Sequence, residues 1–106
     1  MLGLETALSI VQHTMVDSGL LDWAGVAERM SYAPARIGQV PDHGRPIEVG
    51  APANLALYDP AATRTIDAAE SASLSRNTPY AGMQLPGRIE ATFLRGRPTV
   101  LDGKLV

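Results

Sequence analysis

The sequence changes character at residue 39, and this change constrains the fold more than any other feature. Before it, apolar residues recur at helical spacing, whereas after it prolines and glycines separate short apolar runs. The first pattern predicts helices and the second predicts strands joined by turns. We therefore expect an α+β chain with two parts, a helical segment over residues 1–38 and a β-rich segment over residues 39–106.

Three helices are expected in the first part. One should run from Leu4 to about Met15, because its apolar residues fall on one helical face, namely Leu4, Ala7, Leu8, Val11 and Met15. A second should begin at Asp22, a favourable N-cap, and run to about Met30. Pro34 disfavours helical geometry at the residue before it but can open a turn, so residues 34–37 are predicted as a separate short helix ended by Gly38.

The first of these helices has no obvious partner. Its apolar face begins within four residues of Met1, and the two short helices and the β-rich part that follow do not supply a matching surface. We expect this face to pack on polypeptide outside the chain. A truncation, or a separately encoded piece that completes a larger body, accounts for this better than an independent domain does.

The second part predicts short strands, over Asn54–Tyr58, Arg64–Ile66, Arg88–Arg95, Thr99–Leu101 and Lys104–Val106. The Asp102-Gly103 pair is a strong two-residue hairpin signal between the last two strands. Residues 67–87 form a long stretch rich in Ser, Ala, Asn, Pro and Gly, which is unusual for a loop in a compact domain. We expect this stretch either to pack on something or to move.

Composition excludes several classes of function. A net charge of −2 without a run of like charges gives no footprint for nucleic acid or an anionic membrane. The absence of cysteine excludes disulfides and thiolate chemistry, and it suits a cytoplasmic protein. The opening residues lack a basic region and reach polar side chains early, so we expect neither a signal peptide nor a transmembrane helix.

No residue pattern in the chain points to catalysis. His13 and His43 lie 30 positions apart, without the spacing of metal ligands, and we expect both to be structural. The carboxylates fit roles as caps, turns and surface groups: Asp17, Asp22, Asp42, Asp59, Asp67, Glu70 and Asp102. Ser71, Ser73 and Ser75 lack a nucleophile elbow, and the glycines form no phosphate-binding loop. We assign no catalytic, cofactor-binding or metal-binding residue.

One polar loop is a weaker candidate. The segment SRNTPYAG, from Ser75 to Gly82, gathers polar side chains, a proline and a tyrosine. It could line a pocket, or it could anchor its own backbone. We favour the anchoring interpretation.

Five segments, in order, resemble the C-terminal end of bacterial dihydroorotases, most closely those of actinobacteria. They are GLETALSIV at Gly3 to Val11, SYAPARIG at Ser31 to Gly38, GRPIEVGAPANLALYDP at Gly44 to Pro60, SRNTPYAGMQLPG at Ser75 to Gly87 and LRGRPTVLDGKLV at Leu94 to Val106. The third segment is shared by many cyclic amidohydrolases, hydantoinases and allantoinases included. The GLET and NTPYAG pieces point more narrowly to dihydroorotase.

The resemblance implies a fold and a chemistry. Family members have a metal-dependent (β/α)8 barrel, a TIM barrel, flanked by a small β-rich domain built from both chain termini. The helical segment would then be the last barrel helix and the helices after it, and the β-rich segment would belong to the small domain. Zinc, held by histidines and carboxylates, supplies the hydroxide that opens the dihydroorotate ring in pyrimidine biosynthesis. All of those ligands would precede GLET, as would a substrate-binding loop that ends just before Gly3.

The resemblance leaves alternatives for the parent protein. It could be an active dihydroorotase, a non-catalytic dihydroorotase-like scaffold for another pyrimidine-pathway enzyme, or a hydantoinase or allantoinase. In each case the partner of this chain would be the rest of the barrel, with homo-oligomers also compatible. Asn54 stands where the family commonly has Asp, and we interpret that position as a structural turn. The chain alone is expected to be inactive.

Overall fold

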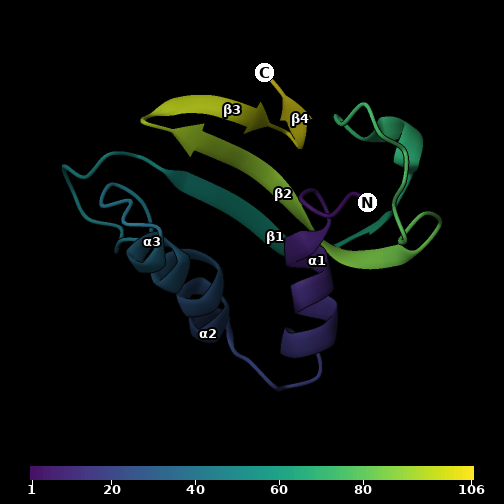
Figure 1. Ribbon diagram of the computed structural model, residues 1–106, viewed down its shortest axis with the longest axis horizontal. Helices are drawn as coiled ribbons and strands as arrows, with labels where there is room; N and C mark the ends of the chain where they lie inside the picture. Colours follow the sequence, from purple (N-terminus) through teal and green to yellow (C-terminus); the bar gives the residue numbers. More distant parts are fainter.

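The computed structural model describes all residues from Met1 to Val106, as a group of helices beside a four-stranded antiparallel sheet (Figure 1). The helical elements are α1 Ala7–Val11, a π-helical turn Gln12–Val16, α2 Trp23–Ala27, a π-helical turn Glu28–Tyr32, α3 Ala33–Ile37 and a 3-10 turn Ala68–Glu70. The strands are β1 Leu55–Thr65, β2 Gln84–Leu94, β3 Arg97–Leu101 and β4 Lys104–Leu105, in the order β1-β2-β3-β4. All helical elements except the 3-10 turn precede the strands along the chain, so the expected α+β class is confirmed.

The first helix forms as predicted but buries a different face. It starts at Ala7 rather than Leu4, because residues 4–6 form a turn. Its buried side chains are polar, at Ser9 and Gln12, while Leu4 is 97% exposed. The reason is that the Gln12 amide hydrogen-bonds to the sheet and turns this face inward. Of the predicted apolar face, Ala7, Leu8 and Val11 are half-buried and Met15 is 40% exposed, so this face is only partly covered within the chain.

The second and third predicted helices are one continuous helical stretch over residues 23–37. Asp22 caps its start as predicted, since its carboxylate accepts a 2.7 Å hydrogen bond from the Gly25 N–H. The predicted break before Pro34 is wrong. A π-helical turn, in which the Ala33 N–H bonds to the Glu28 carbonyl, widens the helix just before the proline. This wider turn accommodates a residue that has no N–H to donate.

The first two predicted strands are also continuous. β1 runs through Leu55–Thr65 with an irregularity between Asp59 and Thr63, where Pro60 lies. The Asp59 carboxylate accepts a 2.9 Å bond from the Ala61 N–H and stabilises this irregularity. β2 pairs with β1 on both sides of this irregularity. The two predicted strands are therefore a single strand.

The C-terminal meander follows the sequence signals closely. Asp102 and Gly103 have φ values of 49° and 72°, the left-handed pair that a two-residue hairpin turn requires. Arg95 and Gly96 repeat this geometry between β2 and β3, with φ values of 50° and 79°. The predicted strand at residues 88–95 is longer than expected, because β2 begins at Gln84.

The hydrophobic core is small for a chain of this length. Only four apolar side chains are buried, Val26, Ile66, Leu85 and Ala91. The accessible surface is 7431 Å², about 1,700 Å² more than a compact monomer of 11.2 kDa exposes. The radius of gyration is 14.4 Å, against roughly 13 Å for a compact domain of this length. None of the helices has the length and apolar character needed to cross a membrane.

Candidate functional site

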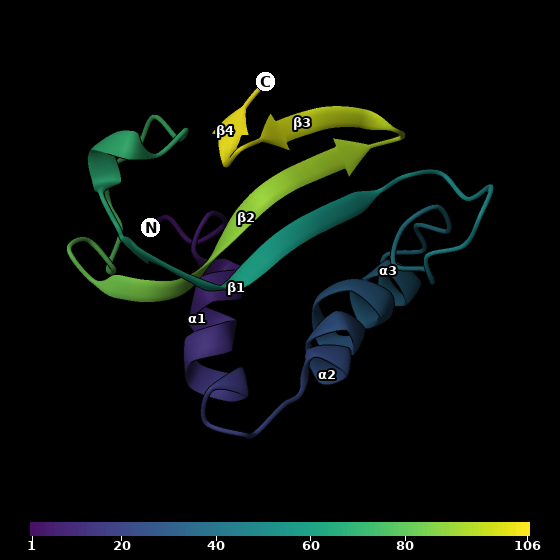
Figure 2. The same ribbon diagram turned by 180° about the vertical axis from the view of Figure 1, so that it is seen from behind.

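Two hollows mark the surface, and the first lies where the N-terminal residues meet the long stretch before β2. We call Leu2–Thr6 the junction segment and Ser71–Gly82 the strap. A cavity of about 360 Å³ lies between residues 1–6 on one side and residues 64–68, 70, 71, 73 and 78 on the other, with Gly103 also in its lining. Figure 2 shows this end of the molecule from behind, with the N-terminus beside the strap. Segments far apart in the sequence therefore form its two walls.

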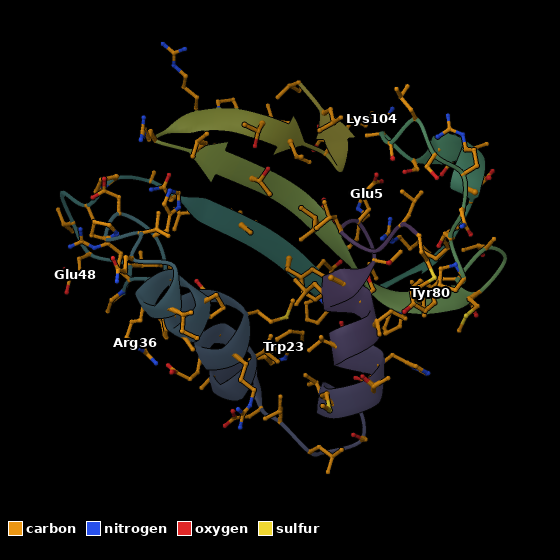
Figure 3. The ribbon with its side chains drawn as sticks, in the orientation of Figure 1. Glu5, Trp23, Arg36, Glu48, Tyr80 and Lys104 are labelled. Carbon is orange, nitrogen blue, oxygen red and sulfur yellow. The ribbon has the colours of Figure 1, made fainter.

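The junction segment is hydrogen-bonded to the strap at both ends. The Leu2 N–H donates to the Asn77 carbonyl at 2.8 Å. The Glu5 carboxylate accepts from the Ser71 hydroxyl at 2.7 Å and from the Ala72 N–H at 3.1 Å. Figure 3 shows Glu5 on the side of the junction segment that faces the strap. The two segments are thus held together by one backbone contact and one shared carboxylate oxygen.

Two arginines support this arrangement, Arg64 from β1 and Arg76 from within the strap. Arg64, near the end of β1, donates to the Glu5 carbonyl at 2.5 Å, and its Nε atom is buried without a partner. Arg76 donates to the carbonyls of Ser71, Ser73 and Ser75, the first at 3.2 Å. One guanidinium therefore folds the strap back on itself, which confirms the interpretation of SRNTPYAG as a segment that anchors its own backbone.

The serines of this region have backbone partners. The N–H groups of Ser73, Ser75 and Asn77 each donate to the hydroxyl two residues earlier, at 3.2 Å to 3.3 Å. These are turn contacts that short hydroxyl side chains form with the following backbone. Ser71 and its neighbours therefore act in the strap as turn residues.

The second hollow is an open groove of about 1,070 Å³ between the helical stretch 23–37 and β1. Figure 1 shows these helices lying alongside β1. Most of its lining is apolar and includes Trp23, Met30 and Phe93, with His43 and Arg45 among its polar residues. An apolar hollow of this size on a small chain is typical of a surface that binds a ligand or another piece of polypeptide.

Tyr58 joins the groove to the sheet. Its ring meets Trp23 edge to face, with centroids 5.6 Å apart and planes at 61°. Burial raises the pKa of its hydroxyl above the ordinary value of 10.0. Gly87, on β2, lies next to the Tyr58 side chain. A Cβ at this position would lie 1.6 Å from the Tyr58 hydroxyl oxygen. Only glycine at this position lets the tyrosine pack against β2.

The two histidines do not come together. His13 is exposed on the π-helical turn after α1, while His43 is half-buried in the groove wall. No group of three or more His, Asp or Glu side chains lies close enough to hold a metal ion.

Asn54 is confirmed as a structural turn residue. Its side-chain N–H donates to the Asp42 carbonyl at 2.8 Å, and its side-chain oxygen accepts from the Arg95 N–H at 2.9 Å. One amide thus ties the loop before β1 to the β2–β3 turn. The predicted cap and turn roles of Asp22, Asp59 and Asp67 are confirmed as well, since each accepts a bond from a nearby backbone N–H.

The sequence prediction missed the contacts made by Gln12 and Glu5. Gln12 interrupts an apolar helix with a polar side chain, and this was the available signal that a partner exists. Glu5 carried no comparable signal, because its partners Ser71 and Ala72 lie more than sixty residues away.

Comparison with known proteins identifies the family. No protein-family model matches the chain. It is 64% identical over 105 residues, 99% of its length, to the dihydroorotase of Streptomyces coelicolor, and 59% identical over 98% of its length to that of Mycobacterium leprae. The fold is similar to that of an L-hydantoinase (dihydropyrimidinase) from Arthrobacter aurescens, with a TM-score of 0.87 and 31% identity over 99% of this chain and 23% of that one.

The match covers only part of each relative. The chain spans about a quarter of the length of the curated relatives it matches, 24% in both dihydroorotases named above. The identity is high along nearly the whole chain, and the fold is shared as well. The likeness therefore reflects membership of a family and not one shared motif. The chain therefore belongs to the dihydroorotase family within the cyclic amidohydrolase superfamily, and it corresponds to the C-terminal quarter of its members.

Proposed function

We propose that this chain is the C-terminal portion of a dihydroorotase, the enzyme that interconverts N-carbamoyl-aspartate and dihydroorotate in de novo pyrimidine biosynthesis. The observation that carries the proposal is 64% identity over 99% of the chain to a protein named dihydroorotase. The function is that of the whole protein. Within it, this chain has a structural role and contributes no catalytic, substrate-binding or metal-binding residue.

Within that protein, residues 1–38 would form the last barrel helix and the helices after it, and residues 39–106 the β-rich part of the small domain. The excess accessible surface of about 1,700 Å² supports this, because it is twice what one partner buries in a standard protein interface. The exposed apolar face at Leu4 and the groove beside Trp23 are the surfaces that the rest of the barrel would cover.

The chemistry in this proposal belongs to the part of the protein outside these residues. The residues that would hold zinc lie in that part, and the metal would supply the activation of water for opening a cyclic amide. This chain would act by excluding water from the apolar face and by fixing where the barrel meets the small domain. We place the complete protein in the cytoplasm, with its barrel as the partner of this chain.

Turnover assays test the proposal. The full-length protein that carries this chain should hydrolyse dihydroorotate, whereas the purified 106-residue chain should not, with or without added zinc. Turnover by the chain alone would contradict the absence of catalytic residues. A folded full-length protein without any turnover would instead support the second candidate, a non-catalytic scaffold for a pyrimidine-pathway enzyme.

The fold likeness to the Arthrobacter aurescens L-hydantoinase favours one other candidate, a hydantoinase or allantoinase. Its 31% identity is about half that of the Streptomyces coelicolor dihydroorotase, so the sequence favours dihydroorotate as substrate. Parallel assays of the full-length protein with dihydroorotate, hydantoin and allantoin distinguish these. Preference for either of the last two would replace the proposed substrate and leave the structural role of the chain unchanged.

A further inference from the structure

The junction segment is held more tightly than an exposed chain end requires. Thr6 is buried, and both its N–H and its hydroxyl bond to the Gly3 carbonyl at 3.2 Å, which closes a turn. Leu2 and Glu5 are fixed to the strap, and Arg64 holds the Glu5 carbonyl. Leu2 and Glu5 thus have hydrogen-bond partners in two other regions of the fold, the strap and β1.

Glu5 has a special place among these contacts. Leu2 and Arg64 act through the backbone of the junction segment, and the Thr6 hydroxyl bonds within it. Glu5 is the one residue of the segment whose side chain hydrogen-bonds to the strap. It is also exposed, so its contribution to the core is small.

The location of this contact matters because the chain corresponds to the C-terminal quarter of its relatives. Under the proposed function, the catalytic groups lie in the polypeptide before Met1 and connect to this chain through the junction segment. A contact that fixes the junction to the strap therefore also fixes the end of the catalytic body relative to the small domain.

We propose that Glu5 is a positioning residue, a latch whose carboxylate holds the strap against the junction segment and keeps the preceding catalytic polypeptide in its working position. The inference rests on the proposed function. Bonds to an ionised acceptor are among the stronger hydrogen bonds, and misplacement of a reacting group by about 1 Å can cost a hundredfold in rate. Because the Leu2 and Arg64 contacts remain, we expect a smaller loss when the carboxylate is removed.

The test uses the full-length protein with four variants. Glu5→Ala should lower kcat/KM for dihydroorotate about tenfold without a matching fall in melting temperature. Glu5→Gln should restore most of the activity, because its amide oxygen can still accept from Ser71 and Ala72. Ser71→Ala should lower kcat/KM less, and the Glu5→Ala/Ser71→Ala double variant should be no worse than Glu5→Ala.

A matched control comes from Glu90, a half-buried carboxylate on β2 that accepts from Arg88 at 2.6 Å and 2.7 Å. Glu90→Ala removes the same charge away from the strap and should leave kcat/KM unchanged. The proposal is overturned if Glu5→Ala stays within about twofold of wild type, if Glu5→Gln is as impaired as Glu5→Ala, or if Glu90→Ala loses as much.

Hydrogen exchange separates failure of this inference from failure of the proposed function. The Leu2 and Ala72 amides should exchange faster in Glu5→Ala than in wild type, whatever the protein catalyses. Unchanged exchange would overturn the latch itself. Absence of dihydroorotate turnover by the wild-type protein, with the faster exchange still seen, would overturn the proposed function and the catalytic consequence of the latch.

Discussion

The hydroxyl of Tyr58 donates a 2.6 Å hydrogen bond to Oε1 of Gln12, a residue 46 positions away. The Gln12 amide nitrogen donates in turn to the Pro60 carbonyl at 3.0 Å, so both ends of this buried amide are satisfied. The contact fixes the first helical element to β1 where the strand becomes irregular. This polar pair therefore helps to fix how the helix lies on the sheet.

Removing the tyrosine hydroxyl should weaken this contact. Tyr58→Phe keeps the ring against Trp23 but leaves Gln12 Oε1 without its donor, at a cost of about 1–2 kcal/mol in the free energy of unfolding. Urea unfolding of the chain checks this prediction. The fluorescence of Trp23, the single tryptophan of the chain, reports the unfolding. An unchanged midpoint would show that the bond contributes nothing net.

Gly87 gives a sharper test of the same packing. A Cβ there would lie 1.6 Å from the Tyr58 hydroxyl oxygen, and φ is +80°. Gly82 is a matched control, since its φ is +77° and no heavy atom lies within 4 Å of its Cβ position. Both Gly→Ala changes incur the left-handed cost, so Gly87→Ala should be destabilised by about 1–3 kcal/mol more, from overpacking alone. Equal unfolding midpoints for Gly87→Ala and Gly82→Ala would contradict the close contact between Gly87 and the Tyr58 hydroxyl.

The Tyr58 environment also predicts a pH dependence. Burial raises the pKa of its hydroxyl above 10.0 in the folded state. The folded chain then holds the proton more tightly than the unfolded chain, so the contribution is complete below a pH of about 10 and is lost as the pH rises through the folded-state pKa. Urea unfolding across this range should show a steeper alkaline loss in wild type than in Tyr58→Phe. The same dependence of stability on pH in wild type and Tyr58→Phe would refute this prediction.

The element types and turn chemistry follow from local sequence, which is why they are predictable. Asp22 caps a helix and Asp102-Gly103 turns a hairpin because each acts on its immediate neighbours. The continuity of β1 depends instead on β2, which pairs on both sides of the irregularity near Pro60. A proline suggests a strand end unless the partner strand is known.

The candidate site was less predictable for the same reason. The strap was recognisable by its polar residues, but the side of the chain it contacts is set by tertiary structure. Glu5 meets Ser71 only because β1 and the strap bring residues 66 positions apart together. In the sequence, Gln12 lies next to the apolar face of the first helix. Only the contact with Tyr58 shows that the helix face carrying Gln12 is buried.

The small core predicts a strong contrast between two leucines. Leu85 is fully buried, whereas Leu4 is 97% exposed. Leu85→Ala should cost about 2–5 kcal/mol in the free energy of unfolding, a large part of the stability of a small domain. Leu4→Ala should leave the unfolding midpoint of the isolated chain unchanged, because it vacates no packed space. Comparable losses in both variants would mean that Leu4 is packed in solution.

Asn54 allows the two halves of one side-chain amide to be separated. Asn54→Asp keeps an acceptor for the Arg95 N–H but cannot donate to the Asp42 carbonyl, while Asn54→Ala loses both bonds. We expect a loss of about 1 kcal/mol for the first variant and about twice that for the second. Urea unfolding gives the order, and hydrogen exchange at the Arg95 amide shows which bond is kept. Fast Arg95 exchange in Asn54→Asp would contradict this division, because the carboxylate would then have left the β2–β3 turn.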